Sequence, residues 1–205
     1  MTNPGTVLRI PHLQDSLVYV ALFQSVKNSS FLRQQLIEGN TTYEYAFLDA
    51  STILSTTHVL AACFRAINDA TANRLRTRNV HSEIVFALSP NNNIAESFRR
   101  FGVADETTSL LAIKVIPTTG TAAGDSSATD AIATHLRGAV EGEPAPFTDE
   151  AFAGLSDVTR IRKLYKAPAP GSSRKKTGVN GTSSSLQELK SLESIIIGSM
   201  AIKGS

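Results

Sequence analysis

The chain has 205 residues, of which 41% are hydrophobic and 19% charged, and 20 basic against 18 acidic residues leave a formal net charge of +2. This composition excludes a collagen, a coiled coil and a fully disordered chain, and it is sufficient for a hydrophobic core. The longest apolar runs, residues 17–23 and 194–202, fall well short of the roughly 20 residues that a membrane-spanning helix needs. No basic segment followed by an apolar one marks the start of the chain. We therefore expect a protein that is neither secreted nor membrane-spanning.

Cys63 is the only cysteine. A single thiol forms neither an internal disulfide nor half of a zinc site, which fits a reducing compartment. The four histidines, His12, His58, His81 and His135, are scattered without the spacing of metal ligands. We interpret them as surface or cap residues, and we expect no metal and no cofactor.

Two stretches, residues 118–130 and 167–185, consist mainly of small and polar residues with almost no large apolar ones. Such segments bury too little apolar surface to offset the entropy of ordering their backbone, so we expect both to be flexible loops. The rest of the chain has the length of one domain, and we expect a single domain over residues 1–205.

Short apolar runs at residues 17–23, 46–48, 83–88 and 109–116 are typical of β-strands. Helical periodicity lies between and after them. The predicted helices cover residues 31–38, 56–75, 94–101, 131–140, a short segment that follows 141–150, 157–166 and 186–202.

Helix ends carry their own signals. Asn93 stands three residues before Glu96, as a capping residue does, and Gly102 stands where a left-handed stop is expected. The helix over 31–38 is expected to end at Gly39. The pattern thus gives four strands and about seven helices. Alternation of strands and helices favours a parallel sheet, although the short linkers leave antiparallel pairing open.

We find no motif that predicts catalysis. The chain has no dinucleotide-binding or phosphate-binding glycine loop and no nucleophile elbow. A Ser89–His81–Asp49 triad can be drawn, but any chain of this length offers such a combination, and nothing in the spacing favours it. We therefore expect no enzymatic activity.

Basic residues are more informative. Arg74, Arg76 and Arg78 place three guanidinium groups within five residues at the predicted end of a helix, where they suit both the helix dipole and phosphate oxygens. Further basic residues lie at 99–100 and 160–166. A nucleic-acid surface and ordinary solvated charges both remain open as interpretations.

The last predicted helix is apolar on more than one side, which exceeds what docking on one surface needs. Its apolar residues are Leu186, Leu189, Leu192, Ile195, Ile196, Ile197, Met200 and Ile202. Either one face meets the domain and another meets a partner, or the helix lies centrally in the core.

Several blocks occur in an order that resembles the small kinase-binding subunit family of the KEOPS (EKC) complex, known in animals as the PRPK-binding protein family. The blocks are VALFQSVKN at 20–28, RTRN at 76–79 with Ser82 and Glu83 after it, LSPNNNI at 88–94, Phe101-Gly102 and IRKLYK at 161–166. The resemblance runs from about residue 17 to 166 and reappears in the C-terminal helix. The two low-complexity stretches depart from the family pattern and look like loop insertions.

The resemblance implies a fold and a function. The family fold is a single mixed α/β (α+β) domain whose largely antiparallel sheet of about four to five strands is flanked by helices, which overrides the preference for parallel pairing. The implied function is non-catalytic: binding and modulating an atypical Ser/Thr kinase/ATPase subunit. That kinase belongs to a complex with a threonylcarbamoyl transferase subunit and a dimerising subunit.

The implied complex modifies the adenosine next to the anticodon in tRNAs that read codons beginning with A, and the small subunit helps to hold the tRNA 3′ CCA end. The family is also linked to telomere maintenance and transcription, with residence in nucleus and cytoplasm. From these implications and the residue pattern, we predict a tRNA contact that combines guanidinium groups with free amides. Its residues are Arg74, Arg76, Arg78, Asn92 and Asn93.

For the kinase contact we predict an apolar centre formed by the last helix and the helix over 56–75. Its residues are Ile197, Met200, Ile202, Leu60 and Phe64. Two other functions remain open, a free-standing RNA-binding module and a small enzyme with an unrecognised site.

Overall fold

A five-stranded sheet forms the centre of the computed structural model, which describes residues 4–118, 126–169 and 181–203. The strands are β1 (Gly5–Leu8), β2 (Ser16–Gln24), β3 (Ala46–Asp49), β4 (Leu110–Pro117) and β5 (Glu143–Ala145). The helices are α1 (Ser29–Ile37), α2 (Thr56–Thr71), α3 (Val80–Leu88), α4 (Ile94–Phe101), α5 (Ser126–Ala139), α6 (Asp149–Leu155), α7 (Val158–Leu164) and α8 (Gly181–Ala201), with short 3₁₀ turns at Thr41–Tyr43 and Ala50–Thr52.

All strand pairs are antiparallel. The order is β1-β2-β4-β3, and β4 pairs along nearly the whole of β2. β1 and β5 therefore share the other edge of β2, end to end. This arrangement confirms the α+β class and the antiparallel sheet that the family resemblance implied. The weak preference for parallel pairing was wrong, because helices separate some strands without acting as parallel crossovers.

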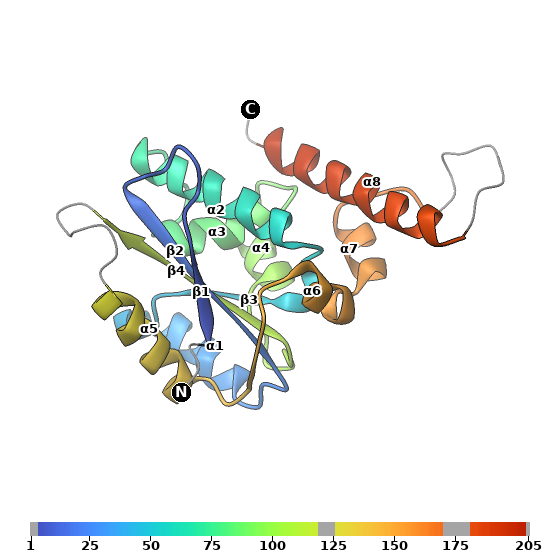
Figure 1. The fold of residues 1–205 in the computed structure, drawn as a ribbon. Coiled ribbons are helices and arrows are strands. Elements are labelled where there is room, and N and C mark those ends of the chain that lie inside the picture. Colours follow the sequence, from blue (N-terminus) through green and yellow to red (C-terminus); the bar gives the residue numbers. More distant parts are fainter. Residues whose placement is uncertain (1–3, 119–125, 170–180, 204–205) are drawn as a thin grey trace.

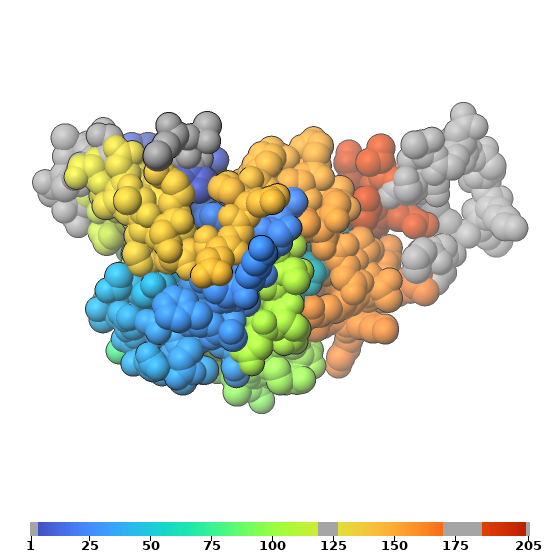
Figure 2. All heavy atoms as spheres, turned by 90° about the horizontal axis from the view of Figure 1, so that it is seen from below, coloured from blue at the N-terminus to red at the C-terminus, as the bar shows by residue number. Residues whose placement is uncertain are grey.

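Both faces of the sheet are buried. Along β2, Val20 and Leu22 belong to the core beneath one layer of helices, while Tyr19 and Phe23 belong to the core on the opposite face. Helices α2 and α3 cover the first face, and α1 and α5 cover the second (Figure 1). Seen from below, α1 in blue and α5 in yellow form neighbouring surfaces (Figure 2). A strand buried on both sides is apolar at every position, which explains the unbroken apolar run at residues 17–23.

The segment predicted as a strand at residues 83–88 is the helix α3. All its residues from Glu83 to Leu88 are buried, so the sequence shows no polar side that would reveal a helical period. The Asn79 side chain caps the helix by accepting a hydrogen bond from the Ser82 amide at 2.9 Å. Burial on all sides thus made a helix look like a strand.

Other boundaries also differ from the prediction. Strands β1 and β5 were missed because they are short and partly exposed. Helix α2 ends at Thr71 rather than 75, and Gly102 after α4 has φ −69°, so it is not a left-handed stop. Gly39 after α1 does adopt a left-handed φ of +70°.

The two predicted loops are each partly helical. Residues 126–130 already belong to α5, and residues 181–185 already belong to α8. Residues 119–125 and 170–180 of these loops lie outside the described residues. A composition rich in Ser, Thr and Ala therefore did not prevent helix formation at the starts of α5 and α8.

His58 is buried within this fold, so of the two interpretations, surface or cap residue, the surface one is wrong. Its Nδ1 accepts a hydrogen bond from the Leu54 amide at 3.3 Å, and its Nε2 lies 2.8 Å from the Tyr165 hydroxyl. Tyr165 in turn donates to the carbonyl oxygen of Leu88. This series of hydrogen bonds requires that the neutral His58 ring carries its proton on Nε2. The series ties α2, α3 and the end of α7 together.

Burial also lowers the pKa of both interior histidines. The pKa of His58 falls to about 3 because of desolvation, and that of His81 falls to about 3 because of desolvation and the nearby Lys114. Both rings are therefore neutral at pH 7, and protonating either one in the folded state is unfavourable.

Acid should consequently destabilise the fold in a defined window. Between about pH 6.5 and 3 the unfolded chain binds protons that the folded chain does not, so the free energy of unfolding falls as pH falls, by up to ~1.4 kcal/mol per pH unit for each histidine. Urea denaturation at several pH values measures the slope. His58→Gln should flatten it, whereas His12→Asn, at an exposed position, should not. An unchanged slope in His58→Gln would contradict this assignment.

Candidate functional site

Helices α2 and α8 lie side by side and run in the same direction (Figure 1). At the start of α2, Ser55 donates a hydrogen bond to the carboxylate of Glu193, in the second half of α8. Ten residues further on in α2, Arg65 donates to the carbonyl oxygens of Met200 and Lys203. Because the two contacts are similarly spaced on both helices, the helices remain adjacent over about three turns.

Arg65 thereby supplies a charged donor to two carbonyl groups at the end of α8, of which that of Met200 also accepts the Lys203 amide at 3.4 Å. Lys203, just beyond α8, is also buried: its ammonium donates to the Phe86 carbonyl oxygen and lies 3.2 Å from the centre of the Phe86 ring. The C-terminal turn of α8 is therefore held by charged groups as well as by apolar packing.

One face of α8 docks on the domain, and the rest remains exposed to a varying degree. Leu192, Ile196 and Met200 are buried at four-residue spacing. Leu186 and Leu189 at the other end are exposed. Of the two interpretations of this helix, the structure supports the one in which a single face meets the domain.

A groove of about 690 Å³ lies between α2 and α8. Four of the five residues predicted for the kinase contact line it together, Leu60 and Phe64 from α2 with Ile197 and Met200 from α8. The fifth, Ile202, is 74% exposed but does not line the groove. Phe64 is 44% exposed, so its ring is available to a partner.

One end of this groove is polar and basic. Its lining there includes Arg65, Arg74, Lys203 and Asp69. Arg74 pairs with Asp69 at 3.0 Å, and Arg65 approaches the same carboxylate at 3.9 Å. Desolvation, with the repulsion of Arg65, lowers the pKa of Lys203 to about 7. Sequence reasoning missed Arg65 and Lys203 because their partners lie more than 100 residues away along the chain.

The arginine segment after α2 is an irregular connection rather than a helix end. Arg74, Arg76 and Arg78 are exposed, while the residues between them are half-buried. The buried Glu83 carboxylate organises the connection by accepting hydrogen bonds from the amides of Arg76 and Thr77 at 3.1 and 2.9 Å. The alternation directs all three arginine side chains outward.

Arg78 lines a second cavity, of about 570 Å³, between α1, α3 and α4. A Cβ placed on Gly39 would lie 3.0 Å from an Arg78 guanidinium nitrogen, so this side chain reaches across to the end of α1. Arg33 and Arg99 line the same cavity, as do aromatic residues such as Tyr43. Three acidic residues, Glu44, Asp105 and Glu106, also line this cavity, so its charges are mixed.

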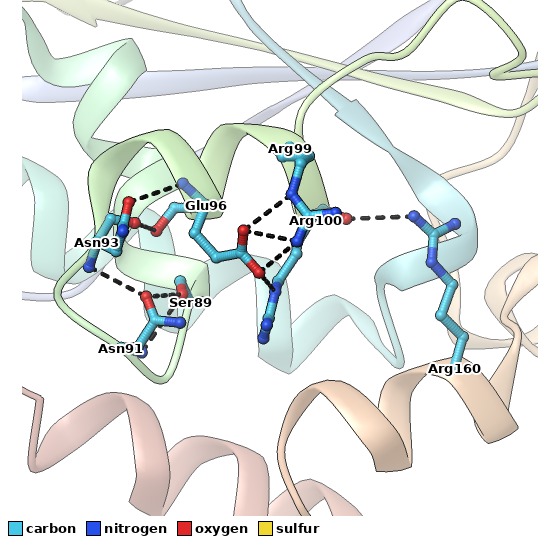
Figure 3. A network of polar contacts seen from close by, with 8 residues as sticks. Ser89, Asn91, Asn93, Glu96, Arg99, Arg100 and Arg160 are labelled. Carbon is cyan, nitrogen blue, oxygen red and sulfur yellow. Dashed lines mark hydrogen bonds and ion pairs between the residues drawn. The ribbon is translucent and has the colours of Figure 1, made fainter.

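Asn92 and Asn93 do not lie next to the arginines. Helix α3 separates the two sets, and its nine residues span about 13 Å. The Asn93 side chain caps α4 by accepting a hydrogen bond from the Glu96 amide at 2.9 Å (Figure 3). The Glu96 carboxylate in turn binds Arg99, at 2.6 Å, and Arg100 (Figure 3). The structure therefore does not form the single basic and amide edge that was predicted.

The residues of the hypothetical triad bind other partners rather than one another. The Nε2 of His81 accepts a hydrogen bond from the Val115 amide at 3.1 Å. Asp49 pairs with Arg160 at 2.8 Å, and Ser89 contacts Asn91. Within the described residues, no cluster of His, Cys, Asp and Glu could hold a metal ion. No helix there is long and apolar enough to cross a membrane.

A sequence model of the CGI-121 family, described as kinase-binding protein CGI-121, matches residues 23–204. The chain belongs to this family of kinase-binding proteins. The matched region includes both walls of the α2/α8 groove.

Individual relatives are similar over most of their length. The chain is 46% identical to the EKC/KEOPS complex subunit cgi121 of Aspergillus fumigatus, covering 100% of this chain and 99% of that one. It is 50% identical to the subunit of the same name from Aspergillus terreus, covering 91% of each. The Schizosaccharomyces pombe subunit is 32% identical over 77% of this chain and 86% of its own.

The contact between Arg65 and α8 can be tested directly. Arg65→Ala should lower the free energy of unfolding by about 1.5–3 kcal/mol, because two carbonyl groups lose a charged donor. Amide hydrogen exchange in the last turn of this CGI-121 family member's α8 should accelerate at the same time. Arg33→Ala, which breaks an exposed pair with Asp105, serves as the control and should have little effect. Unchanged exchange in Arg65→Ala would contradict this role.

Proposed function

We propose that this chain is the non-catalytic EKC/KEOPS subunit that binds and modulates the kinase, and that the kinase docks on the α2/α8 groove. The single observation that carries the proposal is the convergence of Leu60, Phe64, Ile197 and Met200 on one groove in a kinase-binding family. Relatives named as EKC/KEOPS subunits support the assignment to that complex.

The groove has the composition of a docking centre. Protein interfaces usually depend on a few apolar anchors surrounded by polar groups, and aromatic residues are prominent among those anchors. Phe64 is a half-exposed aromatic ring beside the largely buried Met200. Burying this ring under a partner would remove apolar surface from water without any rearrangement of the core.

A supporting role in catalysis follows from this proposal. The transferase and kinase subunits of the complex would perform the chemistry, and this chain would position them or change their activity by binding. The proposal extends to threonylcarbamoyl-adenosine formation in tRNAs that read codons beginning with A, with a more distant link to telomere maintenance and transcription. It also extends to residence in the nucleus and cytoplasm, where those processes take place.

We further propose that the chain helps to hold the tRNA 3′ end, with Arg76 and Arg78 as the central contacts. Both side chains are exposed, and Arg78 borders the cavity between α1, α3 and α4. Arg74 is engaged by Asp69, so it would contribute less. Asn92 and Asn93 would form a separate contact at the other end of α3. Single-stranded RNA ends are held through phosphates, base edges and stacking, which this set of groups can supply.

A free-standing RNA-binding module is the second candidate. The three exposed arginines favour it, because they need no protein partner to meet phosphate. The two candidate functions differ in one measurable property, which is stable association with the kinase.

Phe64→Asp should weaken kinase binding by at least about 30-fold, because a charge would replace a central apolar anchor. The fold should be retained, since the side chain is 44% exposed. Phe31→Asp is a matched control: Phe31 is also 44% exposed but belongs to α1 on the opposite face of the sheet. Affinities of the purified variants for the recombinant kinase subunit give the comparison.

Equal binding by wild type and Phe64→Asp would refute the groove as the docking site, and no binding by wild type would favour the RNA-binding module. Point substitution is preferable to truncation after residue 201. Truncation would also remove Lys203, whose buried ammonium holds the end of α8.

Reversing two charges, Arg76→Glu with Arg78→Glu, should weaken tRNA binding and reduce the dependence of log K on log salt by about 1.4–1.8, because two phosphate contacts are lost. Lys163→Glu with Lys166→Glu makes the same change of charge on and just after α7 and is the control. Filter binding across a range of salt concentrations measures both quantities. Identical behaviour of the two double variants would show a general effect of net charge instead of a defined contact.

A further inference from the structure

We propose that the occupant of the α2/α8 groove is an amphipathic helix of the kinase that places carboxylates over Arg65 and Arg74. This inference rests on the proposed function. It adds the secondary structure of the partner segment, the sign of its charge and its length. Three features of the groove support this occupant: its walls, its length and the charges at its two ends.

The walls offer side chains but no strand edge. Both long walls are helices, whose interior backbone groups are already hydrogen-bonded within each helix. An extended segment laid in the groove would have to leave its own amides and carbonyls without protein partners. A helix brings its backbone already satisfied, so it can be buried in a groove that provides only side chains.

The spacing of the α2 wall also matches a helix. Thr57, Ala61, Phe64 and Asn68 follow one another at intervals of three or four residues, and Leu60 directly precedes Ala61. This stripe forms the ridge that a neighbouring helix meets when side chains of one helix enter the spaces between side chains of another. The wall from Thr57 to Asn68 spans about 17 Å, which corresponds to roughly three turns of a partner helix.

The two ends of the groove differ in charge. Thr57 at the start of α2 is neutral, whereas the far end brings together Arg65 and Arg74 against the single acid Asp69. Lys203 also lines this end, but its side chain is buried and donates to the Phe86 carbonyl oxygen. Arg74 keeps 60% of its side chain exposed despite its pair with Asp69, so it can meet a second carboxylate. Arg65 lies close enough to stabilise Asp69 if Arg74 turns toward the partner. Charge complementarity therefore favours a partner helix with acidic residues at this end.

Charge reversal in this chain tests the acidic end. Arg74→Glu should weaken binding of the recombinant kinase about tenfold at low salt, and the loss should shrink at high salt because the interaction is electrostatic. Arg33→Glu, which reverses another exposed and ion-paired arginine that does not line the groove, should leave the affinity unchanged. Equal affinities of Arg74→Glu and wild type at low salt would overturn the inference.

The kinase segment itself tests the helix. Hydrogen exchange of the kinase with and without the full chain locates the newly protected segment, and Phe64→Asp should abolish that protection. Alanine substitutions along the segment should weaken binding at every third or fourth position, and replacing its acidic residues with Lys should restore binding to Arg74→Glu. Losses at every second position, or protection of this chain by a second copy of itself, would overturn the inference.

The two proposals fail in different ways. If wild type does not bind the kinase, or if Phe64→Asp binds as wild type does, the proposed docking groove is wrong. If binding depends on Phe64 but not on Arg74, or if the losses recur at every second position, the groove is right and the acidic helix is wrong.

Discussion

The architecture depends on a sheet that is apolar on both faces. Because β2 and β4 bury side chains above and below, each face must be covered by helices. Helices α1 and α5 cover one face, and α2 and α3 lie over the other. Helix α8 then has no free sheet surface to cover and packs on α2, in an outer layer (Figure 1).

This outer position explains why a groove exists at all. A helix that packs on another helix leaves a furrow between the two cylinders, and the furrow stays open unless a third element covers it. Leu192 and Ile196 are buried against the domain, Ser55 and Arg65 bind the second half and the end of α8, and Ile197 and Met200 border the groove. The surface that we propose for the kinase is thus a direct result of building a second layer on an already covered sheet.

The chemistry of the interior is consistent with a binding role. Its buried polar side chains are used to connect elements: His58 through Tyr165 to the end of α3, and Glu83 to the connection that carries the arginines. Lys203 holds the end of α8 against α3. Each of these groups is occupied by the fold itself, whereas the Phe64 ring and the guanidinium groups of Arg76 and Arg78 are exposed, and such groups suit protein and phosphate partners.

The sequence alone determined much of the local structure in which a side chain acts on its neighbours, although Gly102 after α4 was wrongly expected to be a left-handed stop. Asn93 capping α4 and Gly39 ending α1 were predictable, because a cap and a left-handed glycine act within one turn. The four apolar residues later found in the groove were also identified, since they belong to strongly apolar helices. The resemblance to the family added the antiparallel sheet, which the alternation of strands and helices along the chain did not predict.

Only the tertiary structure decided what depends on distant partners. The sequence of helix α3 has the pattern of a strand, because the helix is buried on every side. Asn92 and Asn93 lie apart from the arginines because this helix separates them. Arg65 and Lys203 look like ordinary charges in the sequence, yet they close the end of α8 and give the groove its basic end. Local propensity extends over a few residues, whereas burial and charge pairing depend on which segments the fold brings together.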